Sequence, residues 1–136
     1  MQFYQKTLRV ETQGNKSLFA ITEKVREIVT ESQIQAGLCN IFLRHTSASL
    51  LIQEQDAAPD VERFFNQLVP ETDTYLLAGE GSDDMPSHIR SALTHTSEQI
   101  PIAEGKLAMG RLQDLYIWEH RQARQTREVI VSLIGL

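Results

Sequence analysis

The sequence predicts an α+β domain with a compact, sandwich-like core of mostly antiparallel β-sheets and about three helices. Three observations support this fold class. Segments of alternating polar and apolar residues, typical of half-buried strands, are interspersed with segments whose apolar residues recur every three to four positions. The connections between these segments are short. The 136 residues, 41% of them hydrophobic and 23% charged, suit a single domain over residues 1–136.

The N-terminal segment is predicted to form a strand and then a helix. Residues 7–12 alternate in polarity, which indicates a half-buried strand. A helix is predicted from about residue 17, and either Asn15 or Ser17 is suited to cap it. The apolar face of this helix would comprise Leu18, Ile21, Val25, Ile28 and Val29.

Two strands and a second helix are expected in the middle of the chain. The strands are predicted at residues 38–44 and 49–53, separated by a polar segment. Pro59 is placed to open an amphipathic helix that ends before Pro70. We expect this helix to use as its apolar face Val61, Phe64, Phe65 and Leu68.

The second half of the chain predicts one helix followed by strands. An acidic loop at residues 79–84 precedes Pro86, which is expected at the first turn of a helix. The buried side of this helix is predicted to be Ile89, Ala92 and Leu93. The remaining strands, the first two forming a hairpin, are expected at 99–103, 106–109, 115–119 and 128–134. We interpret the segment between the last two strands as a solvated turn, which contains His120, Arg121, Arg124 and Arg127.

Composition argues against several classes of protein. The formal net charge is −5 and no basic face is evident, so we do not expect nucleic-acid binding. The longest apolar runs are too short to span a bilayer, and residues 1–6 lack the pattern of a secretory signal. Cys39 is the only cysteine, which excludes an internal disulfide and suits a reducing compartment. We therefore expect a cytoplasmic protein without a membrane partner, in which Cys39 is an inert core thiol.

Two histidines lie where a functional pocket is expected. His45 follows a strand directly and is followed by Thr46 and Ser47, while His88 lies in the first turn of a helix after the acidic loop. Their spacing alone matches no metal-binding motif, and the sequence around Ser47 is not a nucleophile elbow. A structural role is the more common one for an isolated histidine, and we assign it to His95 and His120.

The nearby carboxylates allow two interpretations. Glu54 and Asp60 flank a short turn and are candidates for the pocket, but Asp60 also fits the first turn of its helix. Asp83 and Asp84 are likewise placed to cap the helix that begins near Pro86. The residues by themselves therefore predict a polar pocket and leave its chemistry open.

The order of the sequence blocks resembles a known family. The chain carries in order HTSASL (45–50), Glu54, ERFF (62–65), EGSDDMPSHIRS (80–91), IPIAEGKLAMG (100–110), Gln113 and WEHR (118–121). This order, over essentially the whole chain, is similar to that of the YjbQ-like family, whose members are described as secondary thiamin-phosphate synthases of unknown primary function. The resemblance implies an α+β fold, assembly as a homotrimer and at most a weak thiamin-phosphate-synthase side activity.

The resemblance also implies which residues form the pocket. The implied catalytic residues are His45, Ser47, Glu54, Asp60, His88 and Glu119. The implied ligand-binding residues are Thr46 and Gln113, to which we add Arg111 as a cation suited to phosphate. If a divalent metal such as zinc or magnesium binds, His45 and His88 would be its ligands.

Two positions depart from the family pattern. The family usually has a histidine shortly after the tyrosine matched by Tyr75, where this chain has Leu76 and Leu77. The family's Gly-Thr-Trp-Gln signature reads Gly-Arg-Leu-Gln at 110–113. Two imidazoles bind zinc poorly unless a carboxylate or a neighbouring subunit completes the set of ligands.

Two functions are therefore weighed against each other. The first is an enzyme-like protein that binds a small anionic or phosphorylated ligand, with or without a divalent metal. The second is a non-catalytic homotrimeric binding or scaffold protein whose site has degenerated. A nucleic-acid module is the least favoured class because the chain is acidic.

Overall fold

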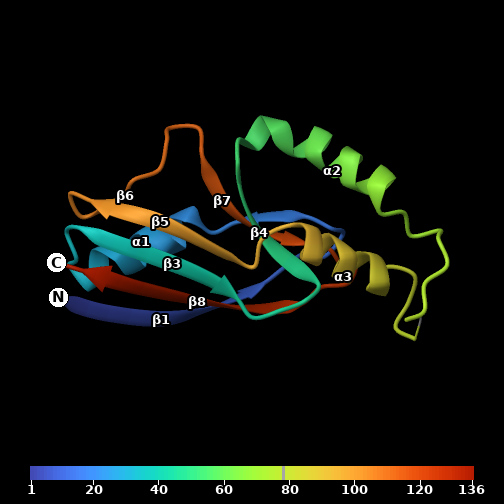
Figure 1. Ribbon diagram of the computed structural model, residues 1–136, viewed down its shortest axis with the longest axis horizontal. Coiled ribbons are helices and arrows are strands. Elements are labelled where there is room, and N and C mark those ends of the chain that lie inside the picture. Colours follow the sequence, from blue (N-terminus) through green and yellow to red (C-terminus); the bar gives the residue numbers. More distant parts are fainter. Residues whose placement is uncertain (78) are drawn as a thin grey trace.

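Two antiparallel sheets form the frame of the computed structural model, which describes residues 1–77 and 79–136 (Figure 1). The larger sheet has the strand order β1-β8-β3-β5-β6 and the smaller one β2-β7-β4. The predicted α+β fold, with mostly antiparallel sheets and about three helices, is confirmed. In chain order the elements are β1 (Gln2–Glu11), β2 (Leu18–Ala20), α1 (Thr22–Ser32), β3 (Gly37–Leu43), β4 (Ala48–Gln53), the 3-10 turn η1 (Gln55–Ala57), α2 (Ala58–Leu68), α3 (Asp84–Leu93), β5 (Ser97–Ala103), β6 (Lys106–Leu107), β7 (Asp114–Glu119) and β8 (Thr126–Gly135).

The hydrophobic core lies between the two sheets and α1. Alternate residues of the strands contribute to it, because successive side chains of a strand point to opposite faces. Val25, Ile28 and Val29 of α1 pack against this core, as their spacing predicts. Cys39 is fully buried in β3, and burial raises the pKa of its thiol to about 12. The prediction that Cys39 lies in the core is confirmed, and the raised pKa favours an inert thiol.

The predicted start of the first helix is wrong. Residues 18–20 form β2, which pairs antiparallel with β7, and the helix begins at Thr22. The expected caps do not act there, because the N-cap position is Ile21 and no side chain caps this end. Thr22 instead accepts a hydrogen bond from the backbone N–H of Leu115 at 2.8 Å, which ties α1 to β7. Leu18 fits a helical period as well as a strand, and only the pairing with β7 decides between them.

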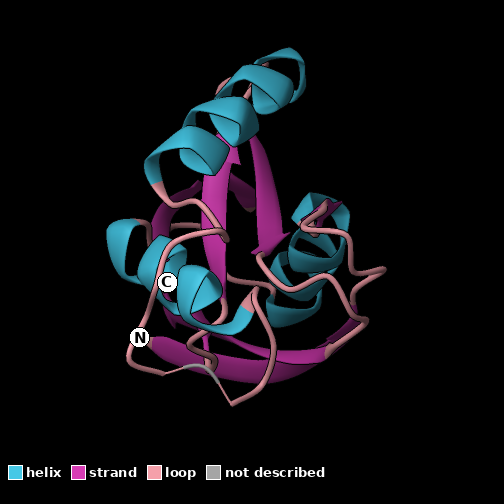
Figure 2. Cartoon of the chain, turned by 90° about the vertical axis from the view of Figure 1, so that its right-hand side faces the viewer, coloured by secondary structure: helices cyan, strands magenta, loops and turns pink. Residues whose placement is uncertain are grey.

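Helix α2 extends away from the sheets at the top of the molecule (Figures 1 and 2). Its bounds agree with the prediction, but it has no buried residue. Phe64 is 58% exposed and Leu68 is 54% exposed. Phe65 makes the main aromatic contact to the body of the molecule, with its ring centroid 5.1 Å from that of Trp118. The predicted apolar face is therefore only partly covered in the single chain, where Val61 and Phe65 are half-buried.

Helix α3 buries a different face from the one predicted. Ala92 and Leu93 are exposed and Ile89 is half-buried, whereas the buried residues are Asp84, Pro86, Ser87, Arg90 and Ser91. Small and polar side chains allow close contact with β4, as shown by the Ser91 hydroxyl, which donates to the carbonyl of Ala48 at 2.9 Å. Apolar periodicity therefore selects the wrong side of a helix that packs through polar residues.

The outer face of the five-stranded sheet carries exposed apolar side chains. Residues of three neighbouring strands contribute, because the pairing aligns Phe3 with Ile134 and Ile134 with Leu38. Phe42 lies on the same strand as Leu38. The exposed fractions are 64% for Phe3, 47% for Ile134, 41% for Leu38 and 43% for Phe42. Across the described parts of the chain, none of the helices combines the length and apolar character needed to cross a bilayer.

Candidate functional site

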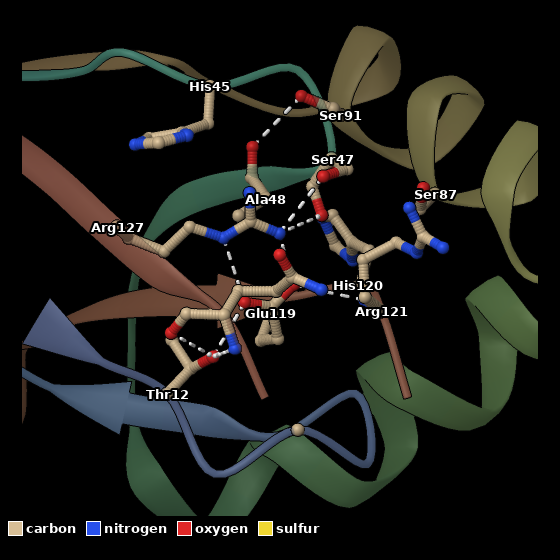
Figure 3. Close-up of polar contacts among 12 residues, drawn as sticks. Thr12, His45, Ser47, Ala48, Ser87, Ser91, Glu119, His120, Arg121 and Arg127 are labelled. Atoms are coloured by element: carbon tan, nitrogen blue, oxygen red, sulfur yellow. Dashed lines mark hydrogen bonds and ion pairs between the residues drawn. The ribbon is translucent and has the colours of Figure 1, made fainter. Parts of the chain in front are cut away.

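A buried polar cluster lies where β4 begins and β7 ends (Figure 3). Glu119 is the last residue of β7 and pairs with Ala48, the first residue of β4. Ser47 precedes β4, and Arg127 comes from the start of β8. Glu119 is fully buried and Arg127 is 4% exposed. The antiparallel pairing of these strands therefore brings together residues that are up to 80 positions apart in the sequence.

Glu119 is held by hydrogen bonds at both carboxylate oxygens. Its Oε1 accepts from the Thr12 hydroxyl at 2.7 Å and from Arg127 Nε at 2.8 Å. Its Oε2 accepts from Arg127 Nη2 and from the backbone N–H of Arg121 at 3.1 Å. A two-pronged Arg–carboxylate contact of this kind fixes geometry as well as charge. Glu119 therefore positions its neighbours, because its oxygens are already engaged.

Arg127 connects this carboxylate to the segment that follows His45. Its Nη2 donates to the Ser47 hydroxyl at 2.9 Å and to the Ser47 carbonyl at 3.2 Å. Ser47 is 8% exposed. The predicted pocket residues Ser47 and Glu119 are thus linked through Arg127, a residue that was not among those predicted for the pocket.

His45 presents one ring nitrogen to the surroundings. Its Nε2 accepts the backbone N–H of Glu128 at 2.8 Å, which requires a lone pair on that nitrogen. Burial and the nearby charge of Arg127 lower the pKa of His45, so the ring is neutral at pH 7 and carries its proton on Nδ1. Within residues 1–77 and 79–136, this Nδ1–H has no hydrogen-bond partner. His45 is half-buried and offers a fixed donor at the rim of the cluster.

His88 joins the two sequence motifs that were expected to form one pocket. Its Nδ1 lies 2.8 Å from the Thr46 carbonyl oxygen, and its Nε2 lies 3.2 Å from Asp84 Oδ1. Both partners are acceptors, so both contacts are hydrogen bonds only while the ring carries a proton on each nitrogen. Arg121 contacts the same Asp84 oxygen at 3.1 Å. These contacts place the start of α3 against residues 45–47.

Asp83 and Asp84 do not cap α3 as their positions predict. Asp83 occupies the N-cap position, but no side chain caps the helix there. The Asp83 carboxylate instead accepts from the backbone N–H of Gln122 at 2.8 Å and pairs with Arg121 at 3.2 Å. The acidic start of α3 therefore binds the loop that follows β7.

The other predicted site residues lie elsewhere. Glu54, Arg111 and Gln113 line a groove of about 220 Å³ at the opposite end of the β4–β7 pair. The paired stretch has six residues on each strand, and the five steps between its ends correspond to about 17 Å. Asp60 lies in the first turn of α2, where its side chain is 84% exposed and pairs with Arg63. The predicted set is therefore divided among three places in the single chain.

The donors of one chain do not fit a resident metal ion. His45 uses Nε2 for a backbone hydrogen bond, and both nitrogens of His88 contact oxygens. At the position expected for a third histidine, Leu77 is 51% exposed. In the part of the chain that the structure describes, no three or more His, Cys, Asp or Glu residues form a group that could hold a metal ion. We therefore derive no chemical step through a metal.

The solvated turn predicted between the last two strands is wrong for two of its four residues, His120 and Arg127. His120 is 1% exposed and Arg127 is 4% exposed, whereas Arg124 is exposed as expected. A signal for Arg127 was present in the sequence, because it shares the two-residue period of Val129, Val131 and Leu133, which are all buried. Thr12 and the buried Arg90 were missed as well. Thr12 continues the two-residue period of Leu8 and Val10, whereas no apolar period identifies Arg90.

The comparisons with known proteins agree on one family. The family model described as "UPF0047 protein YjbQ-like" matches residues 6–136. A UPF0047 protein of Synechocystis sp. is 51% identical over 136 residues, which cover 97% of this chain and 92% of that protein. The UPF0047 protein YjbQ of Escherichia coli O157:H7 is 35% identical over 98% of this chain and 99% of its own length.

Solved structures show the same fold. An uncharacterised conserved protein of the YjbQ/UPF0047 family from Clostridium acetobutylicum aligns with a TM-score of 0.86 and 28% identity. The alignment covers 95% of this chain and 99% of that chain. A protein of unknown function from Sulfolobus solfataricus aligns with a TM-score of 0.87 at 21% identity, covering 99% and 100% of the two chains, which supports the fold alone.

Proposed function

The chain belongs to the UPF0047 YjbQ-like family, and from that premise we propose that it binds a small anionic or phosphorylated ligand beside His45. The observation that carries the proposal is the Nδ1–H of His45. The backbone N–H of Glu128 fixes the ring through Nε2, so Nδ1–H points away from that contact as a preorganised donor. A fixed donor loses little freedom when a ligand oxygen binds to it.

The surroundings of His45 favour an oxyanion over a cation. The side chain of Arg44 is 54% exposed and lies 4.0 Å from the Glu128 carboxylate, a separation that leaves its guanidinium able to reorient. Thr46 is exposed and adds a hydroxyl donor. The Glu119 carboxylate does not oppose an anion, since Arg127 pairs with it. A neutral imidazole, a hydroxyl and a guanidinium together suit phosphate or carboxylate oxygens.

A weak thiamin-phosphate-synthase side activity is part of this proposal. Both substrates of that reaction, a pyrimidine diphosphate and a thiazole phosphate, present phosphate oxygens of the kind that these donors recognise. Complementation of a thiamin auxotroph that succeeds with the wild type and fails with His88→Ala supports the activity. Failure of the wild type to complement, with the protein expressed and folded, contradicts it.

Ligand binding is tested first with inorganic pyrophosphate. We expect a saturable rise in melting temperature for the wild type and binding weakened by about tenfold in His45→Ala, since one charge-assisted hydrogen bond is lost. His95→Ala, which removes an exposed histidine, is the matched control and should bind like the wild type. Equal binding by His45→Ala and the wild type would overturn the proposal.

A divalent metal remains a prediction that requires a donor from a second subunit. Metal analysis of the purified protein, with His45→Ala alongside, tests it. Stoichiometric zinc or magnesium that the variant lacks supports the prediction. A metal content that does not depend on His45 contradicts it.

The expected cytoplasmic location likewise stays a prediction.

The second candidate is a non-catalytic homotrimeric scaffold protein. The exposed apolar side chains of the five-stranded sheet favour self-association, because contiguous apolar surface on a soluble protein commonly marks an interface. The saturated hydrogen bonding of Glu119 also suits a structural role.

Substituting Phe42 tests this self-association. We expect Phe42→Asp to shift the mass measured by light scattering from a trimer to a monomer, because a carboxylate would have to be buried at the interface. Phe64→Asp changes an exposed residue of helix α2. It should leave the trimer intact if the interface lies on the sheet, and should disrupt the trimer if the interface lies on α2. If Phe42→Asp leaves a trimer intact, or if the wild type is a monomer, the proposed interface is wrong.

A further inference from the structure

A second buried polar cluster lies on the other face of β7 from Glu119. Side chains alternate along a strand, so Trp118 and His120 point away from the side on which Glu119 meets Arg127. Arg90 of α3 contacts Asn66 and Val69, beside the Phe65 ring that packs on Trp118. Arg90 is 2% exposed, and Trp118 and His120 are each 1% exposed. The ring centroids of Trp118 and His120 are 4.8 Å apart.

Each of these three side chains holds a nitrogen that lacks a hydrogen-bond partner within the described residues. The three atoms are Arg90 Nε, Trp118 Nε1 and His120 Nδ1. Protein interiors leave few buried polar atoms unpaired, because an unpaired buried donor costs about 1–3 kcal/mol. Trp118 and His120 stack on each other, and the charge of Arg90 acts on His120. Three such atoms in one place favour a shared acceptor over three separate defects of packing.

The charge of Arg90 indicates what kind of acceptor this is. Its known partners are neutral oxygens, namely Asn66 Oδ1 at 3.0 Å and the Val69 carbonyl at 3.2 Å. In the described part of the chain, no carboxylate oxygen lies within 4.0 Å of its guanidinium. Glu71 acts on Arg90 from a distance, but its own close contact is to Lys16 at 2.6 Å. A buried cation without a close anion is unfavourable, so a negatively charged acceptor fits best.

His120 experiences the same positive environment. Burial, and then the charge of Arg90, lower the pKa of this histidine to about 3. Its Nε2 lies 2.9 Å from the Ser49 hydroxyl, which can donate to the neutral ring and so leave the proton on Nδ1. In that tautomer all three unpaired nitrogens are donors.

We propose that Arg90, Trp118 and His120 form a binding site for one small oxyanion, either a carboxylate or inorganic phosphate, enclosed by α2. Arg90 supplies the charge, and the indole and imidazole N–H groups fix the orientation of the anion. Helix α2 covers the cluster through the edge-to-face contact of Phe65 with Trp118. Because α2 has no buried residue, its displacement is the least costly route for an anion to enter. This site is separate from the one beside His45, which lies on the opposite face of β7.

The single tryptophan of the chain makes the site directly observable. In ¹⁵N-labelled full-length protein, the indole N–H of Trp118 gives one signal, and hydrogen bonding to an anion is expected to move it downfield. Separate titrations with inorganic phosphate and with formate distinguish the two classes of anion, and chloride controls for ionic strength. A saturable shift with phosphate or formate, retained in His45→Ala, supports the site even if the ligand proposed beside His45 fails to bind.

Variants of Arg90 provide the second measurement. Arg90→Lys keeps the charge but removes Nε, so we expect oxyanion binding to weaken by about tenfold. Arg124→Lys, on the exposed loop before β8, is the matched control and should titrate like the wild type. If Arg90→Lys does not fold, the variant Trp118→Phe, which loses one donor, is used instead. Its anion binding is measured by calorimetry. An indole signal that neither anion moves, or that moves without saturation, would overturn the site.

Discussion

Replacing Arg127 with methionine is expected to lower the free energy of unfolding by about 3–5 kcal/mol, because it leaves the Glu119 carboxylate buried without a counter-charge. Glu119 is fully buried and receives two of its hydrogen bonds from Arg127. The same substitution removes the donors to Ser47, so the segment after His45 should loosen as well. Chemical denaturation monitored by circular dichroism measures the effect.

Two further variants show whether the effect comes from the buried pair. Arg44→Met removes the exposed partner of Glu128, and exposed pairs contribute only about 0–1 kcal/mol. The double variant Arg127→Met, Glu119→Gln should recover part of the lost stability, because no unpaired carboxylate remains. If Arg127→Met and Arg44→Met cost the same, Glu119 is not held as the hydrogen bonds indicate.

Acidification is expected to destabilise the protein through His120. Burial lowers the pKa of this histidine from 6.5 to about 3. As the pH falls below about 6.5, His120 binds a proton in the unfolded chain but not in the folded chain. The free energy of unfolding therefore falls by about 1.4 kcal/mol per pH unit until about pH 3. Between about pH 6.5 and pH 4.5 the loss from this one residue should reach about 2–3 kcal/mol.

Removing the titrating group isolates this contribution. His120→Gln should shrink the difference in unfolding free energy between the two pH values by about 2–3 kcal/mol. His95→Gln, which changes an exposed histidine, serves as the control and should retain the slope of the wild type. An unchanged slope in His120→Gln would show that this imidazole titrates normally in the folded chain.

β3 and β8 were predictable because alternate residues are buried, and β4 and β7 because they are short apolar runs between polar segments. β3, β4, β7 and β8 lie within a few residues of their predicted positions. The two-residue period of β8 also places Arg127 on the buried side, although its charge led to the opposite interpretation. β2 was not predictable, because Leu18 satisfies a helical and a strand period equally well.

The arrangement of the candidate site was predictable in part. The two polar motifs, at residues 45–48 and 83–88, predict that His88 lies against the segment after His45. His88 contacts the Thr46 carbonyl there. The separation of Glu54 and Gln113 from His45 depends on the register of β4 against β7, which no local pattern reveals. A charged residue such as Arg90 is expected on the outside of an amphipathic helix, whereas α3 packs through its polar face.

The protonation of His45 is the most direct measure of the proposed ligand site. In ¹⁵N-histidine-labelled protein at neutral pH, the ring nitrogens of His45 should report a neutral imidazole with the proton on Nδ1 and a lone pair on Nε2. Pyrophosphate should then move the Nδ1 signal and leave Nε2 on the Glu128 N–H. A proton on Nε2, a doubly protonated ring, or an Nδ1 signal that pyrophosphate does not move would contradict the proposal.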